Sequence, residues 1–141
     1  MRLNVVGFFE KAYSYLPNLS GELKNFIATI LPPLSIIFGL LITLSSVLEL
    51  LGTPLISIFS VKSSGLPAIQ ILLLTNVIGV VQGLFMIFAY GPLKKRLLKG
   101  WKFLVWSQIL WILSAILSFS DSFIIALILL YPIIQAKSEY K

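Results

Sequence analysis

The sequence lacks cysteine and histidine altogether, and only 11% of its 141 residues are charged. Without cysteine the chain cannot form a disulfide, an iron–sulfur cluster or a thiol nucleophile. Without histidine it lacks the commonest general base, haem ligand and zinc ligand. A soluble domain has about 25% charged residues, whereas 58% of this chain is hydrophobic. The composition therefore excludes an ordinary soluble domain, and it excludes a disordered chain, which needs low hydrophobicity.

Four long apolar segments predict an integral membrane protein. A hydrocarbon core about 30 Å thick needs a helix of about 20 apolar residues. Four segments approach that length, at about 31–51, 66–90, 101–119 and 122–140. Positions 34–51 hold twelve Leu, Ile, Phe or Val residues, which favour membrane insertion by roughly 4 to 7 kcal/mol. We therefore predict an all-α fold in which residues 25–141 form a transmembrane four-helix bundle.

The basic residues predict the orientation of these spans. If all four segments cross, ten of the eleven basic residues share one side: Arg2, Lys11, Lys24, Lys94, Lys95, Arg96, Lys99, Lys102, Lys137 and Lys141. Only Lys62 lies on the other side. Because cytoplasmic loops carry the excess of Lys and Arg, we expect both termini and the loop between the second and third spans in the cytoplasm. The same bias favours a full crossing by the fourth segment, although Pro132 interrupts it.

The loop between the second and third spans is the most basic part of the chain. It contains Lys94, Lys95, Arg96, Lys99 and Lys102. Each basic residue near a membrane surface contributes about 1 kcal/mol of attraction to anionic lipids, so we expect this loop to contact anionic headgroups. Topology accounts for the net charge of +6, and we expect no nucleic-acid partner. The flanking aromatic residues are expected in an interfacial belt: Tyr90 and Trp101.

Residues 1–24 predict an amphipathic helix that precedes the first span. One half of its helical wheel is largely apolar: Val5, Val6, Phe8, Phe9, Ala12, Tyr13 and Leu16. Such a helix can lie in the membrane interface with its aromatic face down. The alternative is that it packs on a partner protein. Further along, Pro32 and Pro33 free two backbone carbonyls in the helix leading into the first span, and we expect a bend there.

Each of the first three spans has a stripe of small or polar residues that would allow close helix packing. The predicted packing residues are Ser35, Gly39, Thr43, Thr75, Gly79, Gly83, Ser107, Trp111 and Ser114. Gly79 and Gly83 form a GxxxG pair, which indicates either internal packing or a self-dimer face.

Few polar side chains fall inside the predicted spans. Asn76 and Gln82 lie well inside the second span, where they would form interhelical hydrogen bonds or line a polar path. Glu49 lies near the end of the first span and is a further candidate for that path. Asp121 precedes the fourth span, where a carboxylate suits the N-terminus of a helix, so we expect it to cap that helix.

No enzyme motif or metal-ligand cluster is found, so we expect a non-enzymatic protein without a cofactor. An accessory or scaffolding subunit of a larger membrane assembly accounts best for abundant packing stripes without catalytic groups. Its partners would be other membrane subunits or further copies of the chain. A small dimeric transporter or channel for a small solute is the first alternative. A helical bundle that contacts lipid or pigment is the second.

The C-terminal part resembles a known group of sequences. The segment Gly100-Trp101-Lys102 follows the basic run, and the chain ends with ILLYPIIQAKSEYK over 128–141. Together they resemble the end of small, uncharacterised four-span bacterial membrane proteins. The matching positions are Tyr131, Gln135, Lys137, Tyr140 and Lys141, while Pro132 and Ala136 depart from the pattern. The resemblance implies four spans and a bacterial inner membrane, and it implies no activity.

Overall fold

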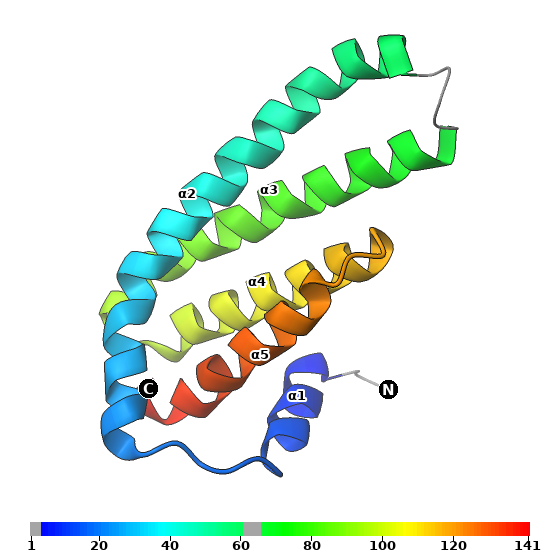
Figure 1. The fold of residues 1–141 in the computed structure, drawn as a ribbon. Helices are drawn as coiled ribbons and strands as arrows, with labels where there is room; N and C mark the ends of the chain where they lie inside the picture. Colours follow the sequence, from blue (N-terminus) through cyan, green and yellow to red (C-terminus); the bar gives the residue numbers. More distant parts are fainter. Residues whose placement is uncertain (1–3, 61–65) are drawn as a thin grey trace.

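The structure, a computed structural model, describes residues 4–60 and 66–141, without the side chains of 53–69. All the regular secondary structure in the described part of the chain is helical (Figure 1). The elements are α1 (Val5–Tyr13), α2 (Gly21–Ser60), α3 (Leu66–Lys94), α4 (Leu98–Leu117), α5 (Ser122–Gln135) and a 3-10 helix, η1 (Ala136–Glu139). The predicted all-α fold is confirmed.

Within the described ranges, four helical stretches are long and apolar enough to cross a membrane: Gly21–Gly52, Gln70–Lys94, Leu98–Leu117 and Ser122–Glu139. The chain is therefore an integral membrane protein by the length and composition of its helices. The predicted third span, 101–119, ends too late, because Phe119 already lies in the turn with a positive φ of 50°. The predicted fourth span, 122–140, is an α-helix only to Gln135 and continues as η1.

Two hairpins make up the bundle. α2 packs along α3, and α4 packs against both α3 and α5. α2 has 40 residues and α4 has 20, which correspond to roughly 60 and 30 Å of helix. Figure 1 shows that α2 and α3 extend well beyond the end of α4 and α5.

The turns that follow α3 and α4 have the same backbone geometry. Leu97 N–H donates to Pro92 O and Arg96 N–H donates to Leu93 O, at 2.9 and 3.0 Å. This pattern is a Schellman motif, whose left-handed position usually holds glycine. Here Arg96 takes that position with a φ of 57°. After α4, Phe119 occupies the equivalent position.

α1 packs against the bundle near α5 (Figure 1). Tyr13 Oη donates to Leu127 O at 2.7 Å, and Lys137 Nζ lies 2.7 Å from Glu10 Oε1. Phe9 is partly buried against the hydrophobic core. The predicted boundary between 24 and 25 falls inside α2, which begins at Gly21.

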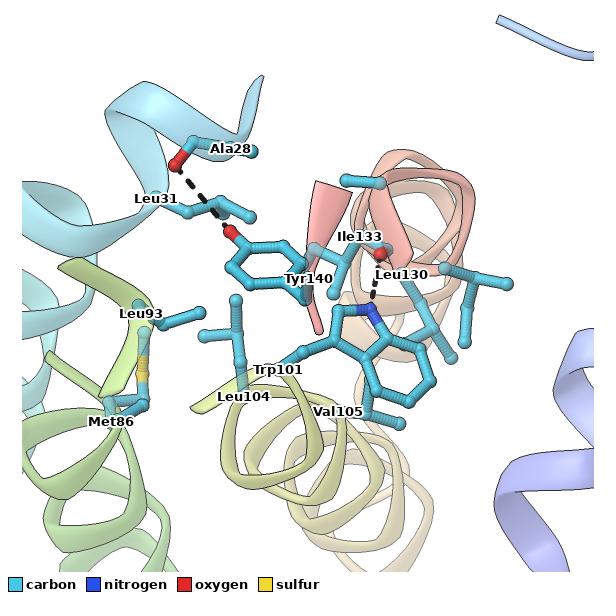
Figure 2. Close-up of a cluster of buried hydrophobic side chains, with 13 residues drawn as sticks. Ala28, Leu31, Met86, Leu93, Trp101, Leu104, Val105, Leu130, Ile133 and Tyr140 are labelled. Atoms are coloured by element: carbon cyan, nitrogen blue, oxygen red, sulfur yellow. Dashed lines mark hydrogen bonds between the residues drawn. The ribbon is translucent and has the colours of Figure 1, made fainter. Parts of the chain in front are cut away.

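The largest cluster of buried side chains surrounds Trp101, at the end of the bundle near the turn from α3 to α4 (Figure 2). Trp101 is only 1% exposed, and its Nε1 donates to Ile133 O at 2.7 Å. Trp101 is therefore a core residue, and its predicted place in an interfacial belt is wrong. Tyr140 Oη donates to Ala28 O at 3.5 Å. That carbonyl lies four residues before Pro32, which has no N–H to donate to it.

Candidate functional site

A cleft of about 490 Å³ lies between the two hairpins. α2, α3 and α4 contribute most of its lining, and α5 contributes Leu129. The lining residues are Phe38, Ile42, Ser46, Thr75, Asn76, Gly79, Gln82, Met86, Gln108, Trp111, Ser114, Ser118 and Leu129. All of these described residues are uncharged, so the cleft combines apolar walls with a small number of neutral polar groups. This volume and composition are typical of small-molecule sites.

Three side-chain amides are the main polar groups of the cleft. Asn76 is 7% exposed, and Gln82 and Gln108 are each 5% exposed. The Nδ2 of Asn76 and the Oε1 of Gln108 are buried without a hydrogen-bond partner. An unsatisfied buried donor or acceptor costs about 1–3 kcal/mol. Two of the three amides therefore have one atom each, Asn76 Nδ2 and Gln108 Oε1, without a hydrogen-bond partner from the protein.

Helical periodicity accounts for the position of these groups. Thr75, Gly79, Gln82 and Met86 follow each other at intervals of four, three and four residues, which places them on one face of α3. All four line the cleft. Asn76 lies beside this stripe and reaches the same cleft.

Gln108 is the functional candidate that sequence reasoning missed. It lies one helical turn before Trp111 on α4, and both residues line the cleft. The spacing of three residues, which puts Gln108 on the same face as Trp111, is the signal that could have identified it.

Small residues bring α2 and α3 close together beside the cleft. A Cβ added to Gly39 would lie 2.9 Å from the backbone O of Gly83, and one added to Gly83 would lie 2.8 Å from the backbone N of Thr43. A Cβ on Gly79 would clash with the side chain of Ser46. The GxxxG pair therefore packs against α2 of the same chain, and the structure does not present it as a self-dimer face.

The remaining predicted packing residues divide into two groups. Ser35 and Ser107 are buried, and their hydroxyls donate to Pro32 O and Leu104 O of their own helices, at 2.8 and 2.7 Å. Thr75, Trp111 and Ser114 instead line the cleft. Trp111 and Ser114 of α4 were predicted to pack closely against another helix, and in the structure they form part of the cleft wall instead.

Glu49 and Asp121 are not brought to the cleft. Glu49 is exposed on α2 and is not one of the lining residues. Asp121 occupies the N-cap position of α5, but its side chain makes no capping hydrogen bond. Its backbone is helical there, with φ −64° and ψ −8°, whereas a capping side chain needs a non-helical residue. The predicted cap is wrong, and Ser120 Oγ accepts the N–H of Ser122 instead.

The basic loop is divided between surface and interior roles. Lys94, Lys95, Lys99 and Lys102 are exposed, and Lys99 Nζ lies 5.7 Å from the centre of the Phe103 ring. Neither of the two ion pairs in the described part of the chain, Arg96–Glu139 and Lys137–Glu10, involves these four lysines. Their side chains are therefore available to a charged surface.

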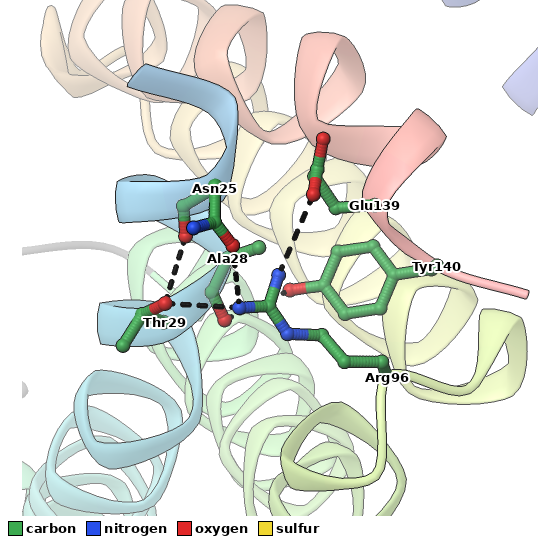
Figure 3. A network of polar contacts seen from close by, with 6 residues as sticks. All are labelled: Asn25, Ala28, Thr29, Arg96, Glu139 and Tyr140. Carbon is green, nitrogen blue, oxygen red and sulfur yellow. Dashed lines mark hydrogen bonds and ion pairs between the residues drawn. The ribbon is translucent and has the colours of Figure 1, made fainter. Parts of the chain in front are cut away.

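Arg96 faces the other helices (Figure 3). One guanidinium nitrogen donates to Asn25 Oδ1 and Thr29 Oγ1 at 3.0 and 2.9 Å, and another lies 3.9 Å from Glu139. Lys141 N–H donates to the backbone O of Arg96 at 2.9 Å. Arg96 therefore joins α2 to the C-terminal segment, a role that the lipid-contact prediction did not include.

The three carboxamides of the cleft are suited to hydrogen bonding with a ligand. Carboxamides neither gain nor lose a proton near neutral pH, so they position a ligand through hydrogen bonds. Within residues 4–60 and 66–141, no group of three or more acidic, histidine or cysteine side chains is placed to hold a metal ion.

No family model, no curated protein and no solved structure matches the chain.

Proposed function

We propose that the protein is a small, non-enzymatic membrane carrier that binds a small uncharged solute between its two helical hairpins. The observation that carries this proposal is the convergence of three buried amides on one uncharged cleft of about 490 Å³. An unsatisfied buried group lowers stability, and Thr43 Oγ1 at the packed contact between α2 and α3 also lacks a partner. Asn76 and Gln108 differ from Thr43 in lining a cleft, which a scaffolding subunit would not need. The cleft therefore favours the transporter alternative over the accessory subunit.

The lining also indicates how such a carrier would be driven. Carriers coupled to protons or ions usually keep an ionisable group at membrane depth. The described lining of this cleft has none, and exposed Glu49 lies outside it. A neutral solute would then move down its own concentration gradient, without an ion that moves with it.

Flux through reconstituted vesicles tests the carrier function. Purified protein in liposomes is assayed with a panel of small uncharged solutes, including alcohols, amides and ketones. We expect flux of at least one solute above that of empty liposomes, with at least a tenfold reduction in Asn76→Leu and Gln108→Leu. Gln70→Leu is the matched control, because Gln70 is exposed on α3 and does not line the cleft. If the protein transports no solute of the panel, the proposal is wrong.

The orientation that accompanies this function places both termini in the cytoplasm of a bacterial cell, with the chain in the inner membrane. The excess of basic residues on one side supports it. Because the chain has no cysteine, single-cysteine variants carry no background in labelling experiments. Ser14→Cys and Ser138→Cys should react only from the cytoplasmic side, and Ser120→Cys only from the opposite side. Reaction of Ser14→Cys and Ser138→Cys on different faces would contradict four crossings.

In the same proposal α1 lies at the membrane interface. Phe8 and Leu16 are 69% and 45% exposed, although Tyr13 is held to α5. Phe8 lies on α1 and Leu16 follows its end. Exposed apolar side chains on and beside a short helix near basic residues suit the boundary between headgroups and acyl chains. The basic side chains of the loop between α3 and α4 would meet anionic lipids at the same face.

An accessory role remains a second candidate because of a different surface. An apolar groove of about 610 Å³ lies between α1 and α5, lined mainly by Phe8, Phe9, Leu16, Leu127 and Ile128. A partner helix could lie in such a groove. Purification in mild detergent followed by mass analysis tests this role, and a monomer without a co-purifying protein would contradict it.

A further inference from the structure

The polar atoms of the cleft carry information about the ligand that would bind there. Asn76 Nδ2 is a donor and Gln108 Oε1 is an acceptor, and neither has a partner. They belong to α3 and α4, on opposite sides of the contact between the hairpins. A ligand head that accepts from the first and donates to the second would satisfy both, once the side chains around them move to expose the two atoms, which are fully covered in this structure.

This requirement does not depend on which way each amide is turned. A carboxamide has one acceptor oxygen and one nitrogen with two N–H donors, and a half-turn only exchanges their places. Asn76, Gln82 and Gln108 thus always present donors and acceptors together. A ketone, ester or ether accepts hydrogen bonds and cannot donate any, so it leaves an amide oxygen unsatisfied.

Charge and shape restrict the ligand further. An ionised head would lose its hydration in a cleft whose described lining has no opposite charge, which disfavours it strongly. The apolar walls include Phe38, Ile42, Met86, Trp111 and Leu129. These side chains suit a compact apolar body, and the indole of Trp111 suits an aromatic one.

We infer that the cleft selects neutral molecules whose head both donates and accepts hydrogen bonds, such as a primary amide or an alcohol, on a compact apolar body. This inference rests on the proposed function, since it specifies the solute that the same cleft would bind. It goes beyond that function because it predicts discrimination between molecules of nearly equal size.

Three probes with the same ring test the inference. Benzamide has a neutral head that donates and accepts, acetophenone has a neutral head that only accepts, and benzoate is charged at pH 7. Binding is followed in nanodiscs by the side-chain amide NMR signals of the protein with ¹⁵N-labelled Asn and Gln. We expect benzamide to bind at least tenfold more tightly than acetophenone, no detectable binding of benzoate, and shifts centred on the Asn76 and Gln108 signals.

Variants separate the amides from the apolar walls. In the double variant Asn76→Leu/Gln108→Leu the preference for benzamide should fall to about onefold, while each single variant should retain part of it. The exposed Gln70→Leu control should keep the full preference. A circular dichroism spectrum identical to that of the parent protein shows that each variant is folded.

The outcomes distinguish this inference from the proposed function. Equal binding of benzamide and acetophenone overturns the selectivity while leaving the carrier function intact, and so does a preference that survives in the double variant. The inference is also overturned if none of the three probes shifts the side-chain amide signals of Asn76 and Gln108. Absence of flux for every solute overturns the carrier function itself.

Discussion

The indole Nε1 of Trp101 donates a hydrogen bond of 2.7 Å to the backbone carbonyl of Ile133. Ile133 lies in the last turn of α5, where helix carbonyls lack partners within the helix. The indole thus satisfies an acceptor that the helix end leaves available, and it joins α4 to α5 in the buried core (Figure 2).

Replacing this indole should destabilise the fold. Trp101→Phe removes the donor and leaves a buried carbonyl unsatisfied, which costs about 1–3 kcal/mol. Trp101→Ala adds a cavity, and the total cost is about 3–5 kcal/mol. Denaturation of the purified protein in mixed micelles, followed by circular dichroism, measures both. Trp106→Phe is the control because Trp106 is 42% exposed, and equal losses for Trp101→Phe and Trp106→Phe would contradict this role.

The contact between α2 and α3 predicts a graded response to alanine. Gly83→Ala places a Cβ 2.8 Å from both Gly39 O and Thr43 N. Because these are backbone atoms, the helices must separate, and we expect a loss of about 1–3 kcal/mol. Gly79→Ala should cost less, since the side chain of Ser46 can rotate away. Denaturation in mixed micelles measures the stability of each variant, and Gly83→Ala should be the less stable of the two.

Gly91→Ala is the matched control for this series. No heavy atom outside its own helical surroundings lies within 4 Å of the added Cβ, and alanine is favoured over glycine in a helix by about 1 kcal/mol. This variant should be as stable as the parent or more stable. If Gly83→Ala were also neutral, the two helices would not be in contact at that glycine.

Phe119 offers a stabilising substitution. Its φ of 50° places an L-residue in the left-handed region, and its side chain is 93% exposed. Phe119→Gly removes a steric cost of about 1–2 kcal/mol with few contacts to lose. We expect a higher midpoint of denaturation for Phe119→Gly than for Phe119→Ala, which keeps the Cβ. The reverse order would show that this turn is not left-handed at Phe119.

Tyr140 predicts a loss of stability in alkali. Burial raises the pKa of Tyr140 to about 12, Arg96 opposes this rise, and Glu139 adds to it. The contribution of a phenol with a raised pKa is fully present below its unfolded pKa of about 10. The contribution is lost as the pH rises through the folded value near 12. Burial also raises the pKa of Tyr13, so the test is the difference between the parent and Tyr140→Phe.

We expect Tyr140→Phe to lose less stability than the parent between pH 10 and about 12. The tyrosinate absorbance of the folded protein should show one fewer late-titrating group in this variant. Lysines titrate in the same range in both proteins, and the comparison removes their effect. Identical alkaline profiles would mean that Tyr140 is not buried.

Hydrophobicity alone predicted the membrane helices, because insertion depends on summed side-chain properties that need no partner. Helix ends were predicted less well. Phe119 and Arg96 occupy left-handed positions that usually hold glycine, so these residue types did not mark where α3 and α4 end. Asp121 had the residue type of a cap and lacks the backbone geometry of one.

The cleft was predicted in part. Asn76 and Gln82 stand out in the sequence because amides are rare in lipid-facing helices. Gln108 was missed because its helix also contains basic and other polar residues, which made one more amide inconspicuous. Trp101 was predicted to lie at the membrane interface because it is close in sequence to the basic loop. Only the tertiary fold shows that η1 and Tyr140 cover that end of the bundle.

The core around Trp101 fastens both hairpins at one end, and α2 and α3 project past α4 and α5 at the other. Trp101 therefore lies where the two hairpins are joined. From there α4, roughly 30 Å long, runs toward the end past which α2 and α3 project. A rotation of one hairpin about this end would change the width of the cleft, so the packing around Trp101 bears on the shape of a cleft that Trp101 itself does not line.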